Sequence, residues 1–474
     1  MSTVKDDVLP AVPSAEIDAS CRAPVLLLFI SGAAWLLIAS VFGLIATLKF
    51  HSPNILAGSS FLTYGRVHPA ALNALVYGFA IQAGLGVGLW IISHLGRTKL
   101  AMSPIIIAGM ILWNLGLTAG ICGILYGDGT GYEWLEFPRY ATGFLFFGYL
   151  AIGLGAMMTF HLRRESQLFI SQWLLLAAIF WLPWIYSTAQ LLLVVKPVRG
   201  VMQAIIDWWY INNLTTIWLG FTGLAAIFYF IPKILNRPLH SHYAGIFIFW
   251  TLAIFGSWGG IPIGSPLPAW IPTMSSVGAV LTVIPVLAVA WNVYKTFDGN
   301  SSPSSAPLKF ITFGTLAFVL SGLAAAIASL QPVSEVVNFT WFTPAQTQLA
   351  VYGFFAMTMF GAIYYIVPRL LGVELAPARV KLHFWLAAVG IAVYVLSLGA
   401  GGVQEGNLLN GPKPFMDIAK STLMPLRMST LGDLLMLLAH ILFLSNLLAL
   451  LVRVGRTTYS TAMIANGRRV GVAS

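Results

Sequence analysis

The stretch Phe342-Thr-Pro-Ala-Gln-Thr-Gln-Leu-Ala-Val-Tyr-Gly-Phe-Phe-Ala-Met-Thr-Met-Phe-Gly-Ala-Ile-Tyr-Tyr-Ile-Val-Pro-Arg369 has no charged side chain before its last residue. Residues 344–367 are long enough for a helix to cross the hydrocarbon core of a bilayer, which takes roughly 20 apolar residues. Gln346 and Gln348 interrupt the apolar run close to its start. The stretch therefore predicts a transmembrane helix that carries a pair of amide side chains.

The composition gives the same prediction for the whole chain. Of its 474 residues, 58% are hydrophobic and 8% are charged, and the mean hydropathy is +0.85. These values exclude an ordinary soluble globular protein and are typical of a polytopic membrane protein. We predict an all-α fold with about twelve transmembrane helices, near residues 24–48, 69–95, 101–126, 138–161, 169–195, 209–231, 243–261, 272–294, 308–331, 344–367, 382–401 and 429–453.

These spans form one predicted membrane domain at 24–455. We expect a disordered cytoplasmic tail at 1–23, because its first residues are polar and include two prolines, and a second cytoplasmic tail at 456–474. The chain has two cysteines, Cys21 and Cys122, which are too few and too far apart for a disulfide framework or a cysteine-based metal site.

The net charge of +10 is distributed as membrane topology requires. With a cytoplasmic amino terminus, 17 of the 25 Lys and Arg residues fall in inner segments and 8 in outer segments. This asymmetry follows the positive-inside rule, so both termini are expected in the cytoplasm and the positive charge does not indicate nucleic-acid binding.

Four further motifs accompany the Gln-Thr-Gln stretch. They are Leu62-Thr-Tyr-Gly-Arg-Val-His-Pro-Ala-Ala-Leu-Asn-Ala74, Tyr132-Glu-Trp-Leu-Glu-Phe-Pro138, Trp208-Trp-Tyr-Ile-Asn-Asn-Leu214 and the span from Phe249 to Gly260. In this order the motifs resemble subunit I of the heme-copper oxidase superfamily, closest to the catalytic subunit of the cbb-type cytochrome c oxidases and more distantly the large subunit of nitric oxide reductase. The resemblance implies the subunit I arrangement of twelve helices, a bacterial inner membrane location, two hemes, one copper ion and the reduction of oxygen.

The positions that match the metal ligands of this family carry other residues. Where the resemblance implies heme and copper histidines, the chain has Ala71, Asn212, Gln346 and Gln348. In the seventh span, Gly256 matches a tyrosine that is cross-linked to a copper ligand. The copper-binding His-His pair is replaced by a shortened segment that contains Gly259, Gly260, Pro262 and Ile263.

The remaining histidines offer no substitute ligand set. A bis-histidine heme needs two imidazoles, a second heme one more, and a copper centre commonly three. Only His440 is expected to lie deep in a span, and a single such histidine is more typical of a hydrogen-bonded core residue than of a ligand. We place His68 and His383 at span ends and Asp433 about one turn into the last span. The sequence therefore predicts no heme, copper or other metal site, and no catalytic residue.

A void of heme size would be too costly to leave empty. Either large aromatic side chains such as Phe354 and Phe355 fill it, or a lipid or quinone-like molecule does. The amides of Asn212, Gln346 and Gln348 are suited to hydrogen bonding with each other or with water.

One motif of the resemblance is retained, the outer loop with Glu133 and Glu136. In the family, the outer face of subunit I docks a membrane-anchored c-type cytochrome subunit. The resemblance implies this subunit and other respiratory-complex subunits as partners, with membrane lipids around the helices and no nucleic acid.

Three hypotheses follow. The first is a subunit I homologue without heme or copper ligands, a redox-inactive scaffold in a respiratory electron-transfer complex. The second is an active oxygen or nitric oxide reductase with unconventional ligation. The third is a transporter or a lipid- or quinone-binding protein that reuses the emptied core.

Overall fold

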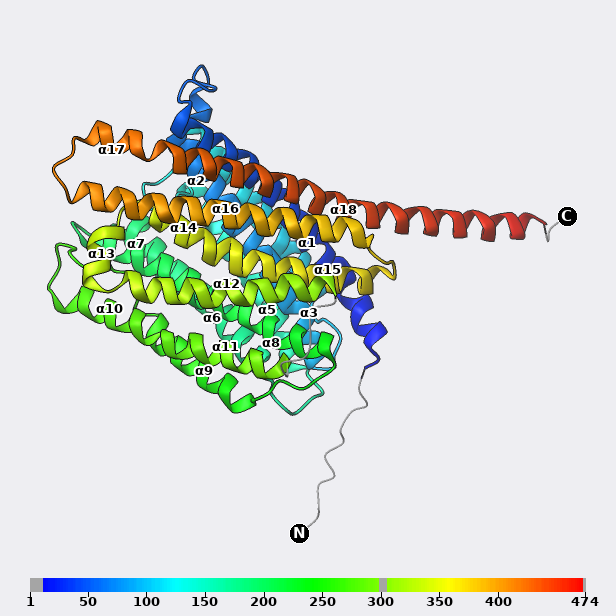
Figure 1. The fold of residues 1–474 in the computed structure, drawn as a ribbon. Helices are drawn as coiled ribbons and strands as arrows, with labels where there is room; N and C mark the ends of the chain where they lie inside the picture. The colour runs from blue at the N-terminus through cyan, green and yellow to red at the C-terminus, as the bar shows by residue number, and fades with distance from the viewer. Residues whose placement is uncertain (1–11, 298–304, 472–474) are drawn as a thin grey trace, which may run out of the picture.

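The computed structural model describes residues 12–297 and 305–471, with side chains as far as Arg453, and within these ranges all regular structure is helical. The helices run roughly side by side in one bundle, and α1 begins at the end where α18 finishes (Figure 1). Eleven helical runs of the described residues are long and apolar enough to cross a membrane. They are Ser14–His51, Tyr64–Leu95, Ser103–Tyr126, Arg139–His161, Ile170–Val195, Met202–Leu235, Trp270–Phe297, Ala306–Ala328, Phe342–Leu371, Pro377–Leu409 and Phe415–Arg453.

Five of these runs correspond to single labelled helices: α1 (Ser14–His51), α4 (Ser103–Tyr126), α5 (Arg139–His161), α12 (Ala306–Ala328) and α16 (Pro377–Leu409). Others combine shorter elements: α6 (Ile170–Ala189) with η3 (Gln190–Val195), α10 (Trp270–Leu281) with α11 (Val283–Phe297), and α17 (Phe415–Ser421) with α18 (Leu423–Gly471). The short helices η1 (Ser60–Leu62) and α13 (Gln331–Val337) lie between spans.

A twelfth apolar helix, α9 (His242–Gly256), is shorter than the rest. With it, the prediction of about twelve transmembrane helices is confirmed, although the seventh helix ends five residues before the predicted boundary at 261. The reason is local: Gly260 has a φ of +96°, which only glycine adopts without strain, and Pro262 follows it.

Three of the eleven runs form the centre of the bundle. Every residue in the most apolar stretch of Tyr64–Leu95 is buried, as are 89% for Met202–Leu235 and 94% for Phe342–Leu371. The other eight runs have values from 33% to 50%, because one face of each points outward to the bilayer. The three central runs are those that carry Ala71, Asn212 and the two glutamines.

Each central run contains a π-helical segment. The first run consists of α2 (Tyr64–Asn73), η2 (Ala74–Ala80) and α3 (Ile81–Leu95), and the second of α7 (Met202–Asn212), η4 (Asn213–Leu219) and α8 (Gly220–Leu235). The third consists of α14 (Phe342–Gln348), η5 (Leu349–Ala356) and α15 (Met357–Leu371). These three π segments begin within three residues after a predicted ligand-replacing position, whereas a further π segment, η3, lies outside the central runs. Such segments are frequent at functional sites.

The amino-terminal boundary differs from the prediction. Residues 1–11 lie outside the described residues, but 14–23 form the first turns of α1, so the predicted disordered tail is wrong over this part. Ile17 and Cys21 are buried, and the Asp18 carboxylate accepts hydrogen bonds of 2.9 Å from both Trp90 Nε1 and His94 Nε2. These contacts to α3 stabilise the helix in a sequence whose polarity suggested disorder. At the other end of the chain, the predicted tail at 456–474 continues α18 as far as Gly471.

Close packing of α4 on α5 depends on glycine. A Cβ atom added to Gly148 would lie 2.8 Å from both the Gly109 carbonyl oxygen and the Trp113 backbone nitrogen. Small residues allow transmembrane helix backbones to approach in this way. Gly143, on the same helix, is exposed and has open space around its Cα.

These two glycines provide a matched test of the packing. We expect Gly148→Ala to lower the thermal unfolding temperature in detergent, since overpacking costs about 1–3 kcal/mol. Gly143→Ala should leave the unfolding temperature unchanged or raise it slightly, because alanine favours a helix interior by roughly 0.5–1 kcal/mol. Equal unfolding temperatures for the two variants would contradict the close approach.

Candidate functional site

The Asn212 side chain, at the end of α7, forms hydrogen bonds through both its donor and its acceptor atom. Its Nδ2 donates to the Gly256 carbonyl oxygen at 2.7 Å, and its Oδ1 accepts from Thr216 Oγ1 at 3.3 Å. The neighbouring amide, Asn213, donates to the Ser257 carbonyl oxygen at 3.2 Å and accepts from Trp181 Nε1 at 3.0 Å. These bonds satisfy polar groups inside the bundle and attach the end of α9 to the second central run.

The segment after α9 closes over Asn212. A Cβ atom at Gly259 would lie 3.0 Å from Asn212 Oδ1, and one at Gly260 would lie 2.6 Å from Asn212 Cβ. Side chains larger than hydrogen therefore have no room at these two positions. Pro262 and Ile263, predicted to lie in the replaced copper-pair region, continue the same segment and are half-buried.

Aromatic rings lie in the centre of the bundle. This was one of the two alternatives that the sequence analysis gave for the space where the family would hold heme. Phe354 and Phe355 are buried, at 3% and 0% exposure. Phe354 lies directly against Gly223, and Phe355 has its ring centroid 6.1 Å from that of Trp218. The glycines Gly84 and Gly223 make room for these rings.

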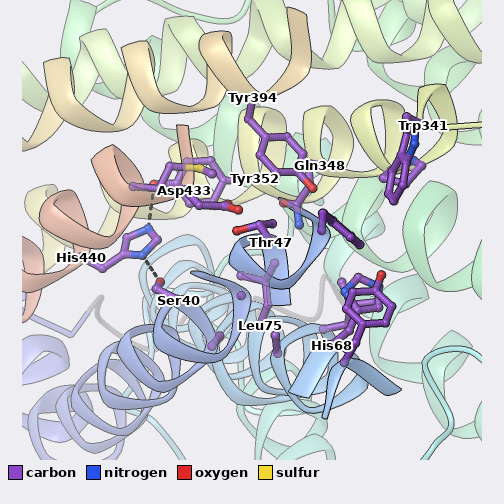
Figure 2. Close-up of a pocket in the computed structure, with 18 residues that line it drawn as sticks. Ser40, Thr47, His68, Leu75, Trp341, Gln348, Tyr352, Tyr394, Asp433 and His440 are labelled. Atoms are coloured by element: carbon purple, nitrogen blue, oxygen red, sulfur yellow. Dashed lines mark hydrogen bonds between the residues drawn. The ribbon is translucent and has the colours of Figure 1, made fainter. Parts of the chain in front are cut away.

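Ala71 and Gln348 face a shared cavity of about 110 Å³, which Gln346 does not line. The cavity runs along α1 between the first and third central runs and is closed on its other sides by α16 and α18 (Figure 2). Its lining is Ala39, Ser40, Gly43, Thr47, Phe50, Tyr64, His68, Ala71, Leu72, Leu75, Trp341, Pro344, Gln348, Tyr352, Tyr394, Asp433, Met436 and His440.

His440 lies at one end of this cavity and is fully engaged (Figure 2). Its Nδ1 pairs with the Ser40 hydroxyl, and its Nε2 lies 2.7 Å from the Tyr352 hydroxyl. Because both ring nitrogens have partners, neither is free to bind a metal. His440 has the hydrogen-bonded environment of a core histidine.

His383 is a second buried histidine of the bundle. Its side chain is 0% exposed although it lies near the start of α16. The ring packs against Phe360 and Phe443, with centroid distances of 4.8 Å and 5.3 Å, and its Nδ1 lies 2.9 Å from the Tyr364 hydroxyl. The place of His383 near the end of a span therefore gave no sign of this burial, which comes from aromatic residues of neighbouring helices.

The side chains at the predicted ligand positions do not fit heme or copper. Alanine has no donor atom, and the Asn212 amide is held by backbone and hydroxyl partners. A cavity of about 150 Å³ holds a molecule of benzene, so one of about 110 Å³ is too small for a porphyrin. Within the described part of the chain, no three His, Cys, Asp or Glu side chains are grouped so that they could hold a metal ion.

The outer loop between α4 and α5 carries Glu133 and Glu136, and hydrogen bonds attach it to the central helices. The buried Glu136 carboxylate accepts from Asn73 Nδ2 at 2.6 Å, and the Glu133 backbone N–H donates to Asp207 Oδ2 at 3.1 Å. The Tyr77 hydroxyl donates to the Trp134 carbonyl oxygen at 2.7 Å. Burial, together with the negative charges of Glu133 and Asp207, raises the pKa of Glu136 to about 8 despite its hydrogen bonds.

The sequence analysis did not predict the polar lining of the cavity as a group. His68 was placed at a span end and Asp433 about one turn into the last span, each singly, and Ser40, Thr47 and Tyr394 were not singled out. The lining comes from five separate helical runs, so sequence spacing could not bring its members together. Asp433, a carboxylate inside an apolar span, was the one signal available.

Comparison with known proteins gives consistent results. Residues 23–435 match the family model described as "Cytochrome C and Quinol oxidase polypeptide I". A cytochrome c oxidase subunit 1 homolog of Agrobacterium tumefaciens is 25% identical, over 78% of this chain and 71% of that protein. The cbb3-type cytochrome c oxidase subunit CcoN1 of Stutzerimonas stutzeri is 22% identical, over 83% of this chain and 86% of the relative. A heme-copper terminal oxidase solved by cryo-electron microscopy superimposes with a TM-score of 0.72 at 16% identity, covering 91% of this chain and 84% of the other.

The raised pKa of Glu136 predicts a pH dependence of stability. The folded protein holds this proton up to about pH 8, whereas an unperturbed glutamate loses it near 4.5. Stability should therefore fall as pH rises through this interval. We expect Glu136→Gln, which keeps the shape of the side chain and removes the ionisation, to weaken the fall of the unfolding temperature between about pH 5 and about pH 9. Asp128→Asn, in the exposed part of the same loop, is the control and should follow the wild-type profile; an unchanged profile for Glu136→Gln would refute the assignment.

Proposed function

The chain belongs to the cytochrome c and quinol oxidase polypeptide I family, and on this basis we propose that it is a redox-inactive member, a membrane scaffold within a respiratory electron-transfer complex. It is a polytopic membrane protein, with eleven membrane-length helical runs in its described residues. The proposal concerns its cofactors: the chain lacks the residues that would bind the hemes and copper of this family.

The observation that carries the proposal is the environment of Asn212. A copper site needs imidazole donors that converge on an open space. Here the Asn212 amide donates a hydrogen bond of 2.7 Å to the Gly256 carbonyl oxygen. The segment with Gly259 and Gly260 packs directly on the Asn212 side chain. The space beside Asn212 is therefore filled by backbone, and the buried Phe354 and Phe355 pack against Gly223 and Gly84 of the other two central runs.

The environment of the cavity supports the same proposal for heme. Ala71 and Gln348 both line a space that is too small for a porphyrin. Two histidines, His68 and His440, also line this cavity and are the candidates for unconventional ligation in an active oxygen or nitric oxide reductase. Both nitrogens of His440 are already bonded to hydroxyl groups, and the His68 ring is stacked on Tyr64 at a centroid distance of 5.1 Å.

The scaffold role is supported by the outer loop. Glu136 and the Trp134 carbonyl oxygen attach the loop to the central helices, so a surface of defined shape faces outward even though the ligand positions have changed. We propose that this face docks a membrane-anchored c-type cytochrome subunit. We also propose a bacterial inner membrane location, which the bacterial relatives support, and cytoplasmic termini, which the distribution of Lys and Arg supports. A transporter or a lipid- or quinone-binding protein is the remaining alternative; the cavity of about 110 Å³ has room for a small transported solute but not for a quinone.

Heme and copper content tests the proposal. We expect the purified chain to contain substoichiometric heme in a pyridine hemochrome assay and substoichiometric copper by mass spectrometry. Any absorbance in the Soret region of the intact complex should belong to the c-type subunit, whose covalently attached heme stays with that subunit on a denaturing gel.

His68→Gln and His440→Gln distinguish the scaffold from an unconventional oxidase. In a scaffold, both variants keep the spectrum of the complex unchanged. A stoichiometric b-type heme in the isolated chain, lost in either variant, would contradict the proposal.

A further inference from the structure

Asp433, on α18, is an acidic side chain inside the bundle that has Thr47 as a hydrogen-bonding neighbour but keeps one carboxyl oxygen unpartnered. Its Oδ2 atom is buried and has no hydrogen-bond partner. The side chain faces the cavity that also contains Thr47, Gln348 and Tyr394 (Figure 2). An oxygen in this position is costly unless something in the cavity compensates it.

No cationic side chain of the described residues provides that compensation. The cavity lining includes no Lys or Arg, and Asp433 takes part in none of the ion pairs found between described residues. The titratable groups that face the cavity are His68 and Tyr64 from α2, Tyr352 from η5, Tyr394 from α16, and His440 from α18 itself. His440 is already bonded to Ser40 and Tyr352.

The rest of the lining suits a small cation. Gln348, Thr47 and the tyrosine hydroxyls offer oxygen acceptors around one space. Near Trp341 the cavity has aromatic walls: the ring of Phe50 lies 5.0 Å from that of Tyr64 and 4.7 Å from that of Trp341. Aromatic faces attract desolvated cations. Tyr64 is 37% exposed, so the cavity reaches the surface of the bundle on this side.

We propose that this cavity is a binding site for a small primary ammonium ion, held by the Asp433 carboxylate, the surrounding hydroxyl and amide oxygens, and the aromatic walls. The N–H donors of an ammonium match an acceptor-rich lining, and a charge-assisted bond to Asp433 would satisfy the buried oxygen. The cavity volume of about 110 Å³ admits an ion of a few heavy atoms and excludes a quinone ring with its tail. The site goes beyond the scaffold role and requires only that no heme occupies the same space, which the heme assay checks separately.

Methylammonium is a suitable probe. At fixed pH and constant ionic strength, we expect methylammonium chloride to raise the unfolding temperature of the purified full-length chain in a saturable manner. Equal concentrations of sodium, potassium or tetramethylammonium chloride should produce a much smaller rise, because none of these cations has an N–H donor for the acceptor-rich lining.

Asp433→Asn removes the charge while keeping the side-chain shape, and should weaken the apparent affinity for methylammonium about 10-fold or more. Asp417→Asn, at an exposed acid on α17, is the matched control and should respond as the wild type does. Tyr394→Phe is a second cavity variant and should also reduce the affinity for methylammonium. It provides the test if Asp433→Asn does not fold. Absence of a response in the wild type, an equal response in Asp433→Asn, or an equal response to tetramethylammonium would each overturn the proposal.

Discussion

A polar group buried in an apolar helical bundle must find its partner inside that bundle, and the centre of this protein is arranged around that requirement. Where the family resemblance implies metal-binding imidazoles, the chain carries an amide whose donor and acceptor are both used locally. Asn212 bonds to Gly256 and Thr216, and the segment after α9 packs on it without room for a side chain. The surrounding backbone closes on this amide, because an unfilled polar space would be destabilising.

The two halves of the predicted ligand region differ in this respect. Beside Asn212 the space is closed by backbone and aromatic rings. Beside Ala71 and Gln348 a cavity persists, with a hydrogen-bonded His440 at one end and an unpartnered Asp433 oxygen. One physical reason for this difference is the residue type at each position. An asparagine can attach a neighbouring helix end by hydrogen bonds, whereas the alanine side chain forms no hydrogen bond.

Much of the fold could be predicted from the sequence, because apolar stretches of membrane length are strong local signals. The family membership was also predictable, from motifs such as Tyr132–Pro138 that lie beside the replaced positions. Local signals failed where tertiary contacts decide the outcome. The polar residues before 23 fold as part of α1 because Asp18 finds Trp90 and His94, and His383 is buried by aromatic residues from distant parts of the chain. The cavity could not be predicted either, since its lining comes from helices that sequence spacing does not relate.

The helical geometry of the three central runs beside Ala71, Asn212 and Gln348 also constrains how this chain can change. Each residue of an α-helix accounts for a rotation of roughly 100° about the axis, so removing one residue from the start of α15 would turn the rest of that helix relative to α14. Phe360 and Tyr364 would then leave the aromatic cluster around His383. Side chains at the ligand positions are therefore free to be exchanged one at a time, whereas the number of residues in the three central runs is not. Insertions and deletions between homologues should accordingly fall in the loops of this bundle. Each of the three central runs should keep its own length from one homologue to the next.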